Sequence, residues 1–572
     1  MRVCFSLLLL SLLHLSFIRT DPEEKYPKDY FRSPIPQQTL LLAGTFGELR
    51  PNHFHAGIDI KATVGTPILA AAEGYLAKIE VSGNGYGKAL YIAHPNGYTT
   101  LYAHMDRFTA EVDAFVKKIQ YESKQFEQEI ELEPNQFSFK KGEQIGRVGL
   151  TGATLGPHLH FEIHETETGD PINPLLFGFK VQDNRAPILQ ELKVYHLNQQ
   201  HQAIEEKTFG LIKYDDSYSF RYDTISISTT EVGFALKGYD PMDNVHNQNG
   251  IYVLSVFQDD SLVYRFQMET FPEEDTRYLN AHLDYSEQIN RNGNFYRCYV
   301  LPYNKLPIYL HKPNNGVVHL REGQISQIKI LAEDYHGNTS TTRFFVKRDS
   351  LEIGNLETGN SEIDYQYVVP HYEESLIQDG DLELFFPIGI FYEDLHLKYE
   401  AIESEMTPYS QVYQINDRSV PVHDYFSIGI RPKNMPEHLK NKAFIAYRAR
   451  TNCGSEWRGD KLHASVRYLG DYRIMVDTIA PSINPVTFKS YMRGYKRMVF
   501  KIGDNFDTAS NMPGLQYEAT VDGQWILLEY DAKSRTIAHT FDGTIKTGKH
   551  LLEITVRDVM GNEKVYKRYF TL

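Results

Sequence analysis

The fold of the first domain is decided by two short stretches, His55-Ala56-Gly57-Ile58-Asp59 and His158-Leu159-His160. In an extended strand, side chains two or four positions apart point to the same face. The histidine and the aspartate of the first stretch therefore share one face, and so do the two histidines of the second. The isoleucine and the leucine between them point into a core. Two such strands bring four polar groups to one point.

Imidazole and carboxylate groups are common ligands of zinc, and a hydrolytic site keeps one coordination position open for water. A lone His-x-His pattern carries little weight, because most histidines bind no metal. The second stretch, however, follows a glycine-rich run, residues 149–157, that lacks the Gly-Lys-Ser/Thr of a phosphate loop. Such a run fits a turn that delivers a strand into a cleft. Taken together, the two stretches predict a zinc hydrolase.

Three motifs also resemble those of a known family, in the family's order: residues 47–59, Tyr102-Ala103-His104 and residues 156–162. They resemble the motifs of the lysostaphin/LytM-type zinc metallopeptidases, which cut the peptides of peptidoglycan. The resemblance covers residues 40–179. It implies that this part of the chain is an antiparallel β-sheet metallopeptidase domain.

The resemblance also implies a role for each polar residue of the motifs. His55, Asp59 and His160 match the zinc ligands, so one zinc ion per chain is expected, with water in the fourth position. His104 and His158 match the two catalytic histidines that do not bind the metal. They orient or deprotonate the water and stabilise the tetrahedral oxyanion.

Two functions follow from the resemblance. The first is an active zinc endopeptidase that hydrolyses peptide cross-links or stem peptides of peptidoglycan. The second is a catalytically weak domain that binds peptidoglycan or activates a partner cell-wall hydrolase, as degenerate domains of this type do. Degenerate domains lack metal ligands, and none is missing here, which favours the active enzyme.

Three other histidines of this region are expected to bind no metal. His53 could share the face of His55, but a further imidazole would close the open position, so His53 is expected in the cleft wall. His94 precedes an Asn-Gly hairpin turn and is expected to be structural. His164, at the end of its strand, is expected to be structural as well.

An insertion at residues 108–140 departs from the brevity usual in the family. Val112, Val116 and Ile119 fall at helical spacing, so a helix followed by a strand-like return is expected. The insertion is expected to form either a wall or lid beside the cleft or a neutral elaboration of the surface.

Residues 1–20 are predicted to be a signal peptide. Arg2 precedes an apolar stretch, residues 5–18, that is shorter than the roughly 20 residues of a membrane span. Export to the periplasm, cell envelope or extracellular space is expected, with an uncleaved anchor as the alternative. No other membrane-length apolar run follows. Cys298 and Cys453 are expected to be free, buried thiols, because two cysteines are too few for a disulfide-stapled scaffold.

Composition indicates a large, folded, mostly β protein. The chain has 572 residues, 41% of them hydrophobic, which is enough for three or four independent cores. Its 39 tyrosines and 32 phenylalanines favour strands. A net charge of -15 without a basic patch argues against nucleic acid as a partner.

Two partial repeats divide the rest of the chain. Residues 183–188 recur as residues 477–483, each with Ala-Pro after an aspartate, and residues 333–338 recur as residues 557–562, each with Gly-Asn after an aspartate. This pair of motifs, one that opens a segment and one that precedes its closing strand, resembles the motifs of bacterial immunoglobulin-like sandwiches. The aspartates offer too few oxygen ligands for calcium, so plain turns are expected and no calcium site is assigned.

About three β-sandwich domains are therefore expected after the peptidase domain. Residues 183–349 are expected to be immunoglobulin-like with insertions, residues 350–362 a linker, residues 363–476 a β-rich domain of uncertain type, and residues 477–572 a second immunoglobulin-like sandwich. These domains are expected either to hold the catalytic domain at a distance from a membrane or dock it on a cell-wall assembly, through a cell-envelope protein partner, or merely to shield or stabilise the enzyme. The two tryptophans, Trp457 and Trp525, are expected in domain cores.

Overall fold

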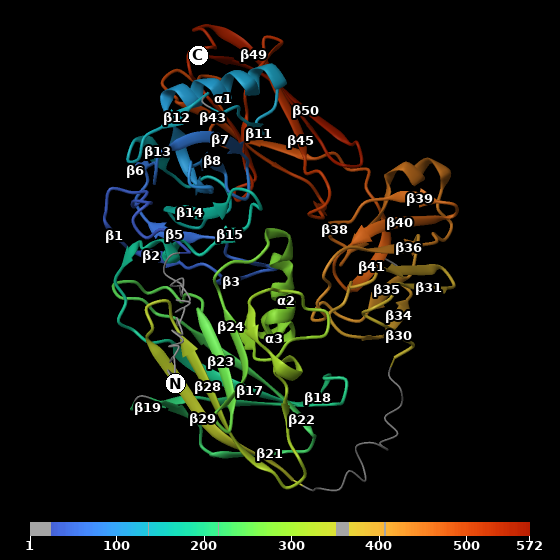
Figure 1. Cartoon of the computed structure of the whole chain (residues 1–572). Coiled ribbons are helices and arrows are strands. Elements are labelled where there is room, and N and C mark those ends of the chain that lie inside the picture. Colours follow the sequence, from blue (N-terminus) through green and yellow to red (C-terminus); the bar gives the residue numbers. More distant parts are fainter. Residues whose placement is uncertain (1–24, 135, 216, 350–364, 405–407) are drawn as a thin grey trace, which may run out of the picture.

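The computed structural model describes residues 25–134, 136–215, 217–349, 365–404 and 408–572. The expected signal peptide and linker lie outside the described residues. The chain is mostly β, as the sequence predicts (Figure 1). Within the described part of the chain, no helix combines the length and apolar character needed to cross a membrane. Cys298 and Cys453 are both free and buried.

The domain that the motifs predict to be a metallopeptidase, here called the peptidase domain, is built on one antiparallel sheet. Its strands follow the order β11-β7-β8-β9-β14-β5-β2, with β12 beside β7 and β15 beside β14. Their bounds are β2 (Leu42–Gly44), β5 (Ile58–Lys61), β7 (Gly74–Val81), β8 (Lys88–Ala93), β9 (Tyr98–Ala103), β11 (Gln128–Glu131), β12 (Ser138–Phe139), β14 (His158–Glu165) and β15 (Pro171–Ile172).

Strand β14 lies between β5 and β9, and its alternating pattern decides which side chains reach the site. Leu159, Phe161 and Ile163 are fully buried in the core beneath the sheet. The intervening residues point to the other face, as the period of two requires. In the antiparallel register, His160 lies opposite Asp59 on β5.

A smaller sheet closes the core of this domain, in the order β10 (Met105–Phe108), β13 (Gln144–Val148) and β6 (Pro67–Leu69). A short hairpin, β3 (Leu49–Arg50) and β4 (His53–Phe54), lies within the first motif and leads into His55. Phe54 belongs to the core of the following domain rather than to its own, and its amide donates to Thr276 Oγ1 at 2.8 Å. The first two domains therefore share packing.

The insertion forms a helix and a returning strand. Helix α1 (Ala110–Ser123) begins after Thr109, whose hydroxyl accepts from the amide of Val112. Strand β11 then pairs with the edge of β7. Helix α1 lies under the C-terminal domain in Figure 1. Of the insertion, Glu131 at the end of β11 is the residue that lines the cleft.

The second domain is a sandwich of two sheets around one core. The first sheet contains β17 (Ile188–Leu197), β18 (Ala203–Gly210), β22 (Glu231–Tyr239), β25 (Phe295–Arg297) and β27 (Val318–His319). The second contains β19 (Ile212–Tyr214), β20 (Ser217–Ser219), β21 (Thr224–Ile227), β23 (Val253–Gln258), β24 (Ser261–Gln267), β26 (Tyr309–His311), β28 (Ile325–Glu333) and β29 (Thr339–Arg348). Short helices α2 (Leu279–His282) and α3 (Tyr285–Arg291) lie between β24 and β25.

The third domain also has two sheets and its own core. One sheet contains β31 (Ser375–Asp379), β32 (Leu382–Phe386), β36 (Phe426–Ile430), β39 (Glu456–Arg458) and β40 (Lys461–Val466). The other contains β34 (Tyr399–Ile402), β35 (Val412–Ile415), β37 (Ala443–Tyr447), β38 (Thr451–Asn452), β41 (Gly470–Val476) and, from the next domain, β44 (Asp507–Thr508). A separate pair is formed by β30 (Tyr367–Val369) and β33 (Leu395–Leu397).

The C-terminal domain is a third sandwich, with a core between two sheets. One contains β42 (Ser482–Pro485), β43 (Arg497–Gly503), β47 (Glu529–Asp531) and β48 (Thr536–Thr540). The other contains β45 (Gln516–Val521), β46 (Gln524–Trp525), β49 (Lys549–Arg557) and β50 (Glu563–Thr571).

The sequence repeat corresponds to the same set of hydrogen bonds in two domains. In the second domain, Asn338 donates to Asp334 Oδ2 at 2.7 Å and to the carbonyl of Asp183 at 3.4 Å. In the C-terminal domain, Asn562 makes the equivalent bonds to Asp558 and Asp477. The asparagine of the closing turn thus ties the entry segment of each sandwich to its last hairpin.

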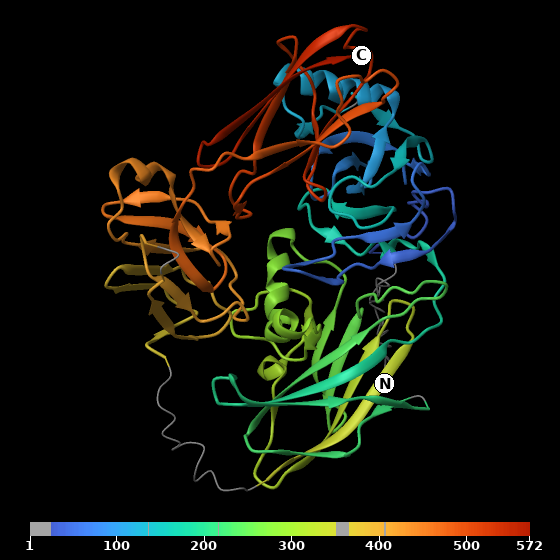
Figure 2. The same cartoon turned by 180° about the vertical axis from the view of Figure 1, so that it is seen from behind.

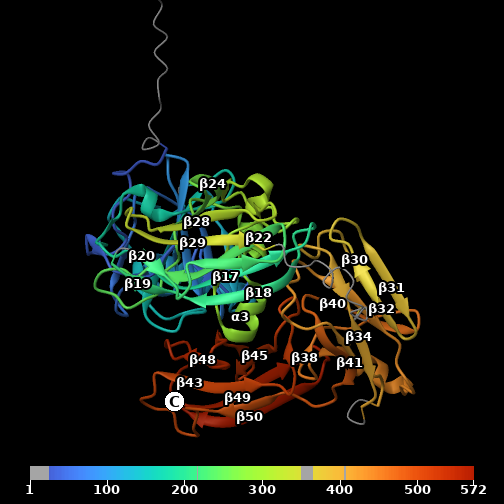
Figure 3. The same cartoon turned by 90° about the horizontal axis from the view of Figure 1, so that it is seen from below.

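The domains close into a ring, so that the last one returns to the first (Figures 1 and 2). The second and third domains meet where Tyr392 Oη donates to the carbonyl of Arg277 at 3.0 Å. The third and fourth share the pairing of β38 with β44. The C-terminal domain then contacts the peptidase domain, where the amide of Ala532 donates to the carbonyl of Gly83 at 3.1 Å. Figure 3 shows the C-terminal and third domains side by side.

Candidate metal centre

Three of the predicted residues converge on one point. His55 immediately follows β4, Asp59 lies on β5 and His160 lies on β14. Asp59 Oδ1 lies 3.0 Å from His55 Nε2 and 2.8 Å from His160 Nδ1, and the two imidazole nitrogens are 3.0 Å apart. All three side chains are buried. Two nitrogens and one carboxylate oxygen around a point form a donor set that suits zinc.

Hydrogen bonds behind the donors fix which ring nitrogen faces this point. His55 Nδ1 donates to the carbonyl of Thr45 at 2.8 Å, and His160 Nε2 donates to Glu162 Oε1 at 2.5 Å. The opposite nitrogens, His55 Nε2 and His160 Nδ1, are then the ones available to a cation. Such outer partners are typical of histidines that bind metals. The residues therefore fit a zinc ion.

Glu162 is a functional residue that the sequence analysis missed. It is fully buried, and besides His160 it accepts from Tyr86 Oη at 2.7 Å and from His164. His160, Glu162 and His164 alternate along β14 and so share one face. The same parity that selects the two histidines of the second motif could therefore have found the glutamate.

Charges in the site are strongly coupled. Burial raises the pKa of Asp59, but the charge of His55 and hydrogen bonds from His158 and His160 outweigh it and hold this pKa well below its usual range. Burial lowers the pKa of His160, but bonds to Asp59 and Glu162 raise it to about 9. Asp59 is therefore ionised, as metal binding requires, and a metal would displace the proton that the raised pKa keeps on His160.

The two other predicted histidines lie beside the donors. The ring centroids of His104 and His158 are 4.9 Å apart, and that of His104 is 5.8 Å from that of His160. His104 directly follows β9 with a φ of 58°, in the left-handed region that is rare for residues with a side chain. Its Nδ1 donates to the carbonyl of Thr151 at 2.9 Å. The bend after β9 places the imidazole beside His158 and His160.

The environments of these two histidines are set by the glycine-rich loop. Burial and the nearby charges of His160 and His158 lower the pKa of His104 to about 3, so this imidazole is neutral near pH 7. His158 Nδ1 donates to the carbonyl of Gly156 at 2.9 Å, while its Nε2 lies 3.3 Å from Asp59 Oδ1. All five predicted residues are thus brought together.

Arg50, within the first motif, also reaches the site. Its Nη2 donates to Asp59 Oδ2 at 3.1 Å and to Glu48 Oε2 at 2.8 Å. Arg50 therefore occupies one oxygen of Asp59 and leaves the other, Oδ1, among the three donors. The sequence analysis assigned no role to Arg50 or Glu48.

The five predicted residues and Arg50 line an open cleft of about 1640 Å³. Its walls come chiefly from the peptidase domain, and Asn247 and Glu273 of the second domain complete them. His53 lies in this wall, with its Nδ1 donating to the carbonyl of Pro51 at 2.9 Å. His94 lies away from the cleft and bonds the carbonyl of Glu73 at 2.7 Å.

Two further groups of acidic residues lie at the turns of the sequence repeat. They consist of Asp183, Asp334 and His336, and of Asp477, Asp504 and Asp558. The amides of Asn338 and Asn562 each donate at 2.8 Å to the turn aspartate four residues earlier. These are turn contacts, and no metal is assigned to either group.

Comparisons with known proteins place two segments in described families. Residues 53–121 match Peptidase family M23, and residues 366–477 match the Zu5-like domain. The first match includes His55, Asp59 and His104. The second coincides with the third domain of the structure.

Curated relatives match about a fifth of this chain. The DD-carboxypeptidase/endopeptidase Mpg of Neisseria meningitidis is 37% identical over 121 residues, which are 21% of this chain and 22% of that protein. The peptidoglycan DD-endopeptidase ShyC of Vibrio cholerae is 34% identical over 108 residues, 19% of each chain. This chain thus spans about a fifth of the length of these relatives.

Among solved structures, the catalytic domain of the prophage-encoded M23 protein EnpA from Enterococcus faecalis is 26% identical. The match covers 27% of this chain and 97% of that one, with a TM-score of 0.19. The resemblance drawn from the motifs is confirmed by the family match and the relatives. The N-terminal domain of this chain is a peptidase family M23 domain.

Proposed function

We propose that this chain is an exported zinc metalloendopeptidase that hydrolyses peptide cross-links or stem peptides of bacterial peptidoglycan. The observation that carries the proposal is the convergence of His55 Nε2, Asp59 Oδ1 and His160 Nδ1 in the wall of an open cleft, with His104 and His158 beside them. The names of the relatives support the substrate class.

Different side chains have different chemical roles in this proposal. Zinc bound by the three donors would lower the pKa of a bound water from about 15.7 to about 7. His104 is neutral near pH 7, and its Nδ1–H is engaged by Thr151, so Nε2 is the nitrogen that can accept a proton. Such general-base assistance contributes about 10²- to 10⁴-fold in rate.

His158 has a different role from His104 in this proposal. Its Nδ1–H is engaged by the carbonyl of Gly156, which orients the ring within the cleft. When its Nε2 also carries a proton, a histidine in this place can donate a hydrogen bond to the oxygen that becomes negative in the tetrahedral state. Donors preorganised for a developing oxyanion are worth about 10² to 10³ in kcat.

The test uses purified residues 21–572 and bacterial sacculi. We expect one zinc per chain by elemental analysis and soluble cross-link fragments by mass spectrometry. His160→Ala should lose both, because it removes one of three donors. His246→Ala, at an exposed histidine of the second domain, is the matched control and should keep both.

The alternative is a catalytically weak domain that binds peptidoglycan or regulates a partner hydrolase. It predicts binding to sacculi without released fragments, even when the chain carries a full complement of zinc. That result would overturn the enzymatic proposal. A zinc-free chain that still cleaves would overturn the metal assignment.

A further inference from the structure

The hairpin between β47 and β48 of the C-terminal domain touches the peptidase domain. At its tip, Lys533 Nζ donates to the carbonyl of Leu150 at 2.7 Å and to that of Thr154 at 3.3 Å. The neighbouring amide of Ala532 donates to the carbonyl of Gly83 at 3.1 Å. One hairpin therefore contacts two loops of the peptidase domain, residues 82–87 and residues 149–157, which we call the wall loops.

The wall loops pack against each other as one unit. The amide of Ala153 donates to the carbonyl of Gly85 at 2.7 Å. A Cβ added to Gly152 would lie 2.3 Å from that same carbonyl oxygen, so the backbones are in close contact. Residues of both loops line the cleft, among them Tyr86 and Thr154. Movement of either wall loop would therefore move the other.

Both non-ligand histidines depend on the wall loops. His104 donates from Nδ1 to the carbonyl of Thr151 at 2.9 Å and from its amide to the carbonyl of Tyr86 at 3.0 Å. His158 Nδ1 lies 2.9 Å from the carbonyl of Gly156. Lys533 donates to the carbonyls of Leu150 and Thr154. These flank Thr151, whose carbonyl accepts from His104.

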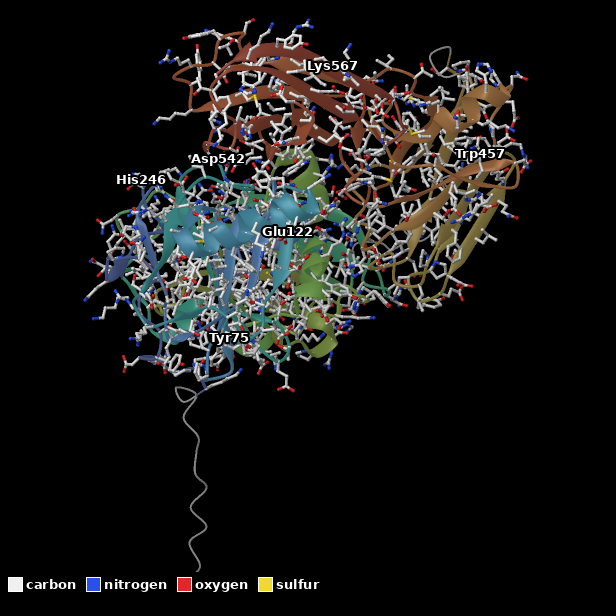
Figure 4. All side chains as sticks on the ribbon, turned by 90° about the horizontal axis from the view of Figure 1, so that it is seen from above. Tyr75, Glu122, His246, Trp457, Asp542 and Lys567 are labelled. Atoms are coloured by element: carbon white, nitrogen blue, oxygen red, sulfur yellow. The ribbon has the colours of Figure 1, made fainter. Side chains whose placement is uncertain are left out.

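The insertion supplies the rest of this interface. Lys117 of α1 forms an ion pair with Asp542 of the C-terminal domain. The rings of Tyr121 and Trp525 meet edge to face, with centroids 5.2 Å apart. Trp525 therefore lies between domains rather than in a domain core, where the sequence analysis expected it. In Figure 4, Asp542 lies beside the helix that carries Glu122.

The C-terminal domain also packs against the core of the peptidase domain. Leu527 and Tyr530 pack against the same cluster of buried residues that supports the catalytic sheet. The ring of Tyr530 covers Gly83, where an added Cβ would lie 2.6 Å from it. The contact thus combines apolar packing, an ion pair and hydrogen bonds, which fix the hairpin relative to the wall loops.

We infer that the β47–β48 hairpin is a positioning element of the peptidase site, and that Lys533 holds the wall loops so that His104 and His158 keep their places beside the metal donors. This inference rests on the proposed function. It makes the C-terminal domain a structural part of the catalytic centre, and the insertion its docking platform. Lys533 itself is a positioning residue, since it touches loop carbonyls and not the reacting atoms.

The test compares full-length Lys533→Met, Lys533→Arg and Lys567→Met. Lys567 lies on β50, in the other sheet of the same domain, where it pairs with Glu553. We expect Lys533→Met to lower kcat about tenfold or more, because small misplacements of catalytic groups cost up to about 10²-fold. KM and zinc content should change less than twofold. Lys533→Arg should restore most of kcat, and Lys567→Met should match the unmodified chain.

Hydrogen exchange supplies a readout that does not depend on activity. Amides of residues 149–157 should exchange several times faster in Lys533→Met than in the unmodified chain or in Lys567→Met. Unchanged exchange together with unchanged kcat would overturn the inference. If the unmodified chain proves inactive on sacculi, the proposed function fails, while the exchange rates still decide whether Lys533 holds the wall loops.

Discussion

At the scale of single residues, hydrogen bonds orient the two histidines that offer nitrogen atoms to a metal. His160 faces the donor point through Nδ1 only because buried Glu162 engages Nε2, and His55 is fixed in the same way by the carbonyl of Thr45. Burying a carboxylate is costly unless hydrogen bonds satisfy it. Glu162 meets this condition with bonds from His160, His164 and Tyr86.

Glu162→Gln tests this supporting role. An amide keeps the shape of the carboxylate but removes its charge, so His160 loses basicity and orientation. We expect zinc affinity to fall about 10- to 100-fold, the usual cost of losing such a partner. Competition with a chromogenic chelator measures it. Affinity equal to that of the unmodified chain would show that Glu162 contributes only to packing.

His104→Ala separates metal binding from turnover. His104 lies beside the donors without belonging to them, so the variant should retain one zinc per chain. Its kcat on sacculi should fall about 10²- to 10⁴-fold, because the proton acceptor is gone. Elemental analysis and fragment release are measured on the same sample. A variant as active as the unmodified chain would remove His104 from the mechanism.

At the scale of secondary structure, the pairing of β5 with β14 assembles the site. Gly57 allows the close approach of these strands, since a Cβ at this position would lie 2.4 Å from the carbonyl oxygen of Phe161. The register that places His160 opposite Asp59 depends on that contact. A glycine within the first motif therefore contributes to the geometry of the three proposed metal donors.

Gly57→Ala should destabilise the domain and disturb the donors at once. The backbone has no room for the methyl group, so we expect the free energy of unfolding to fall by about 3 kcal/mol, the upper range for overpacking. Denaturant titration measures the change. Gly210→Ala, on β18, is the control, because an added Cβ there meets nothing within 4 Å. Similar stability of both variants would contradict this account of the motif.

At the scale of the whole molecule, the ring places the C-terminal domain against the domain that begins the described chain. The ion pair between Lys117 and Asp542 bridges residues that are 425 positions apart. Burial raises the pKa of Asp542, but hydrogen bonds from Lys117 and Thr544 outweigh it and lower this pKa to about 2. The pair lies on the docking platform formed by the insertion.

The pH dependence of docking follows from that shift. A carboxylate whose pKa is depressed stabilises the folded arrangement fully above its ordinary value of 3.8, and this contribution is lost as the pH falls through about 2. Fluorescence of Trp525 at the interface, recorded in a Trp457→Phe background, should therefore stay constant from pH 7 to about 4 and change below.

A charge reversal tests the same pair at neutral pH. Lys117→Asp should shift the emission of Trp525 toward that of an exposed indole, because two carboxylates then face each other. The double variant Lys117→Asp with Asp542→Lys should restore it, since the attraction returns with opposite sense. Emission unchanged in the single variant would show that apolar packing alone holds the domain in place.

Much of the fold and the site could be predicted because the rules involved are local. Alternation along β14 and the first motif predicts which side chains share a face, and the spacing of Val112, Val116 and Ile119 predicts α1. Those patterns depend on the fixed periods of strands and helices. They also explain why Glu162 was within reach of the same reasoning.

What the sequence by itself determined is the set of side chains available to the site and the periodicity that points them to one face. Only the tertiary structure decided that Trp525 lies between domains, that the insertion is a docking platform, and that Lys533 reaches carbonyls some 380 positions earlier in the chain. Periodicity is a property of consecutive residues. Contacts between distant segments depend on how whole domains pack, which no local pattern encodes.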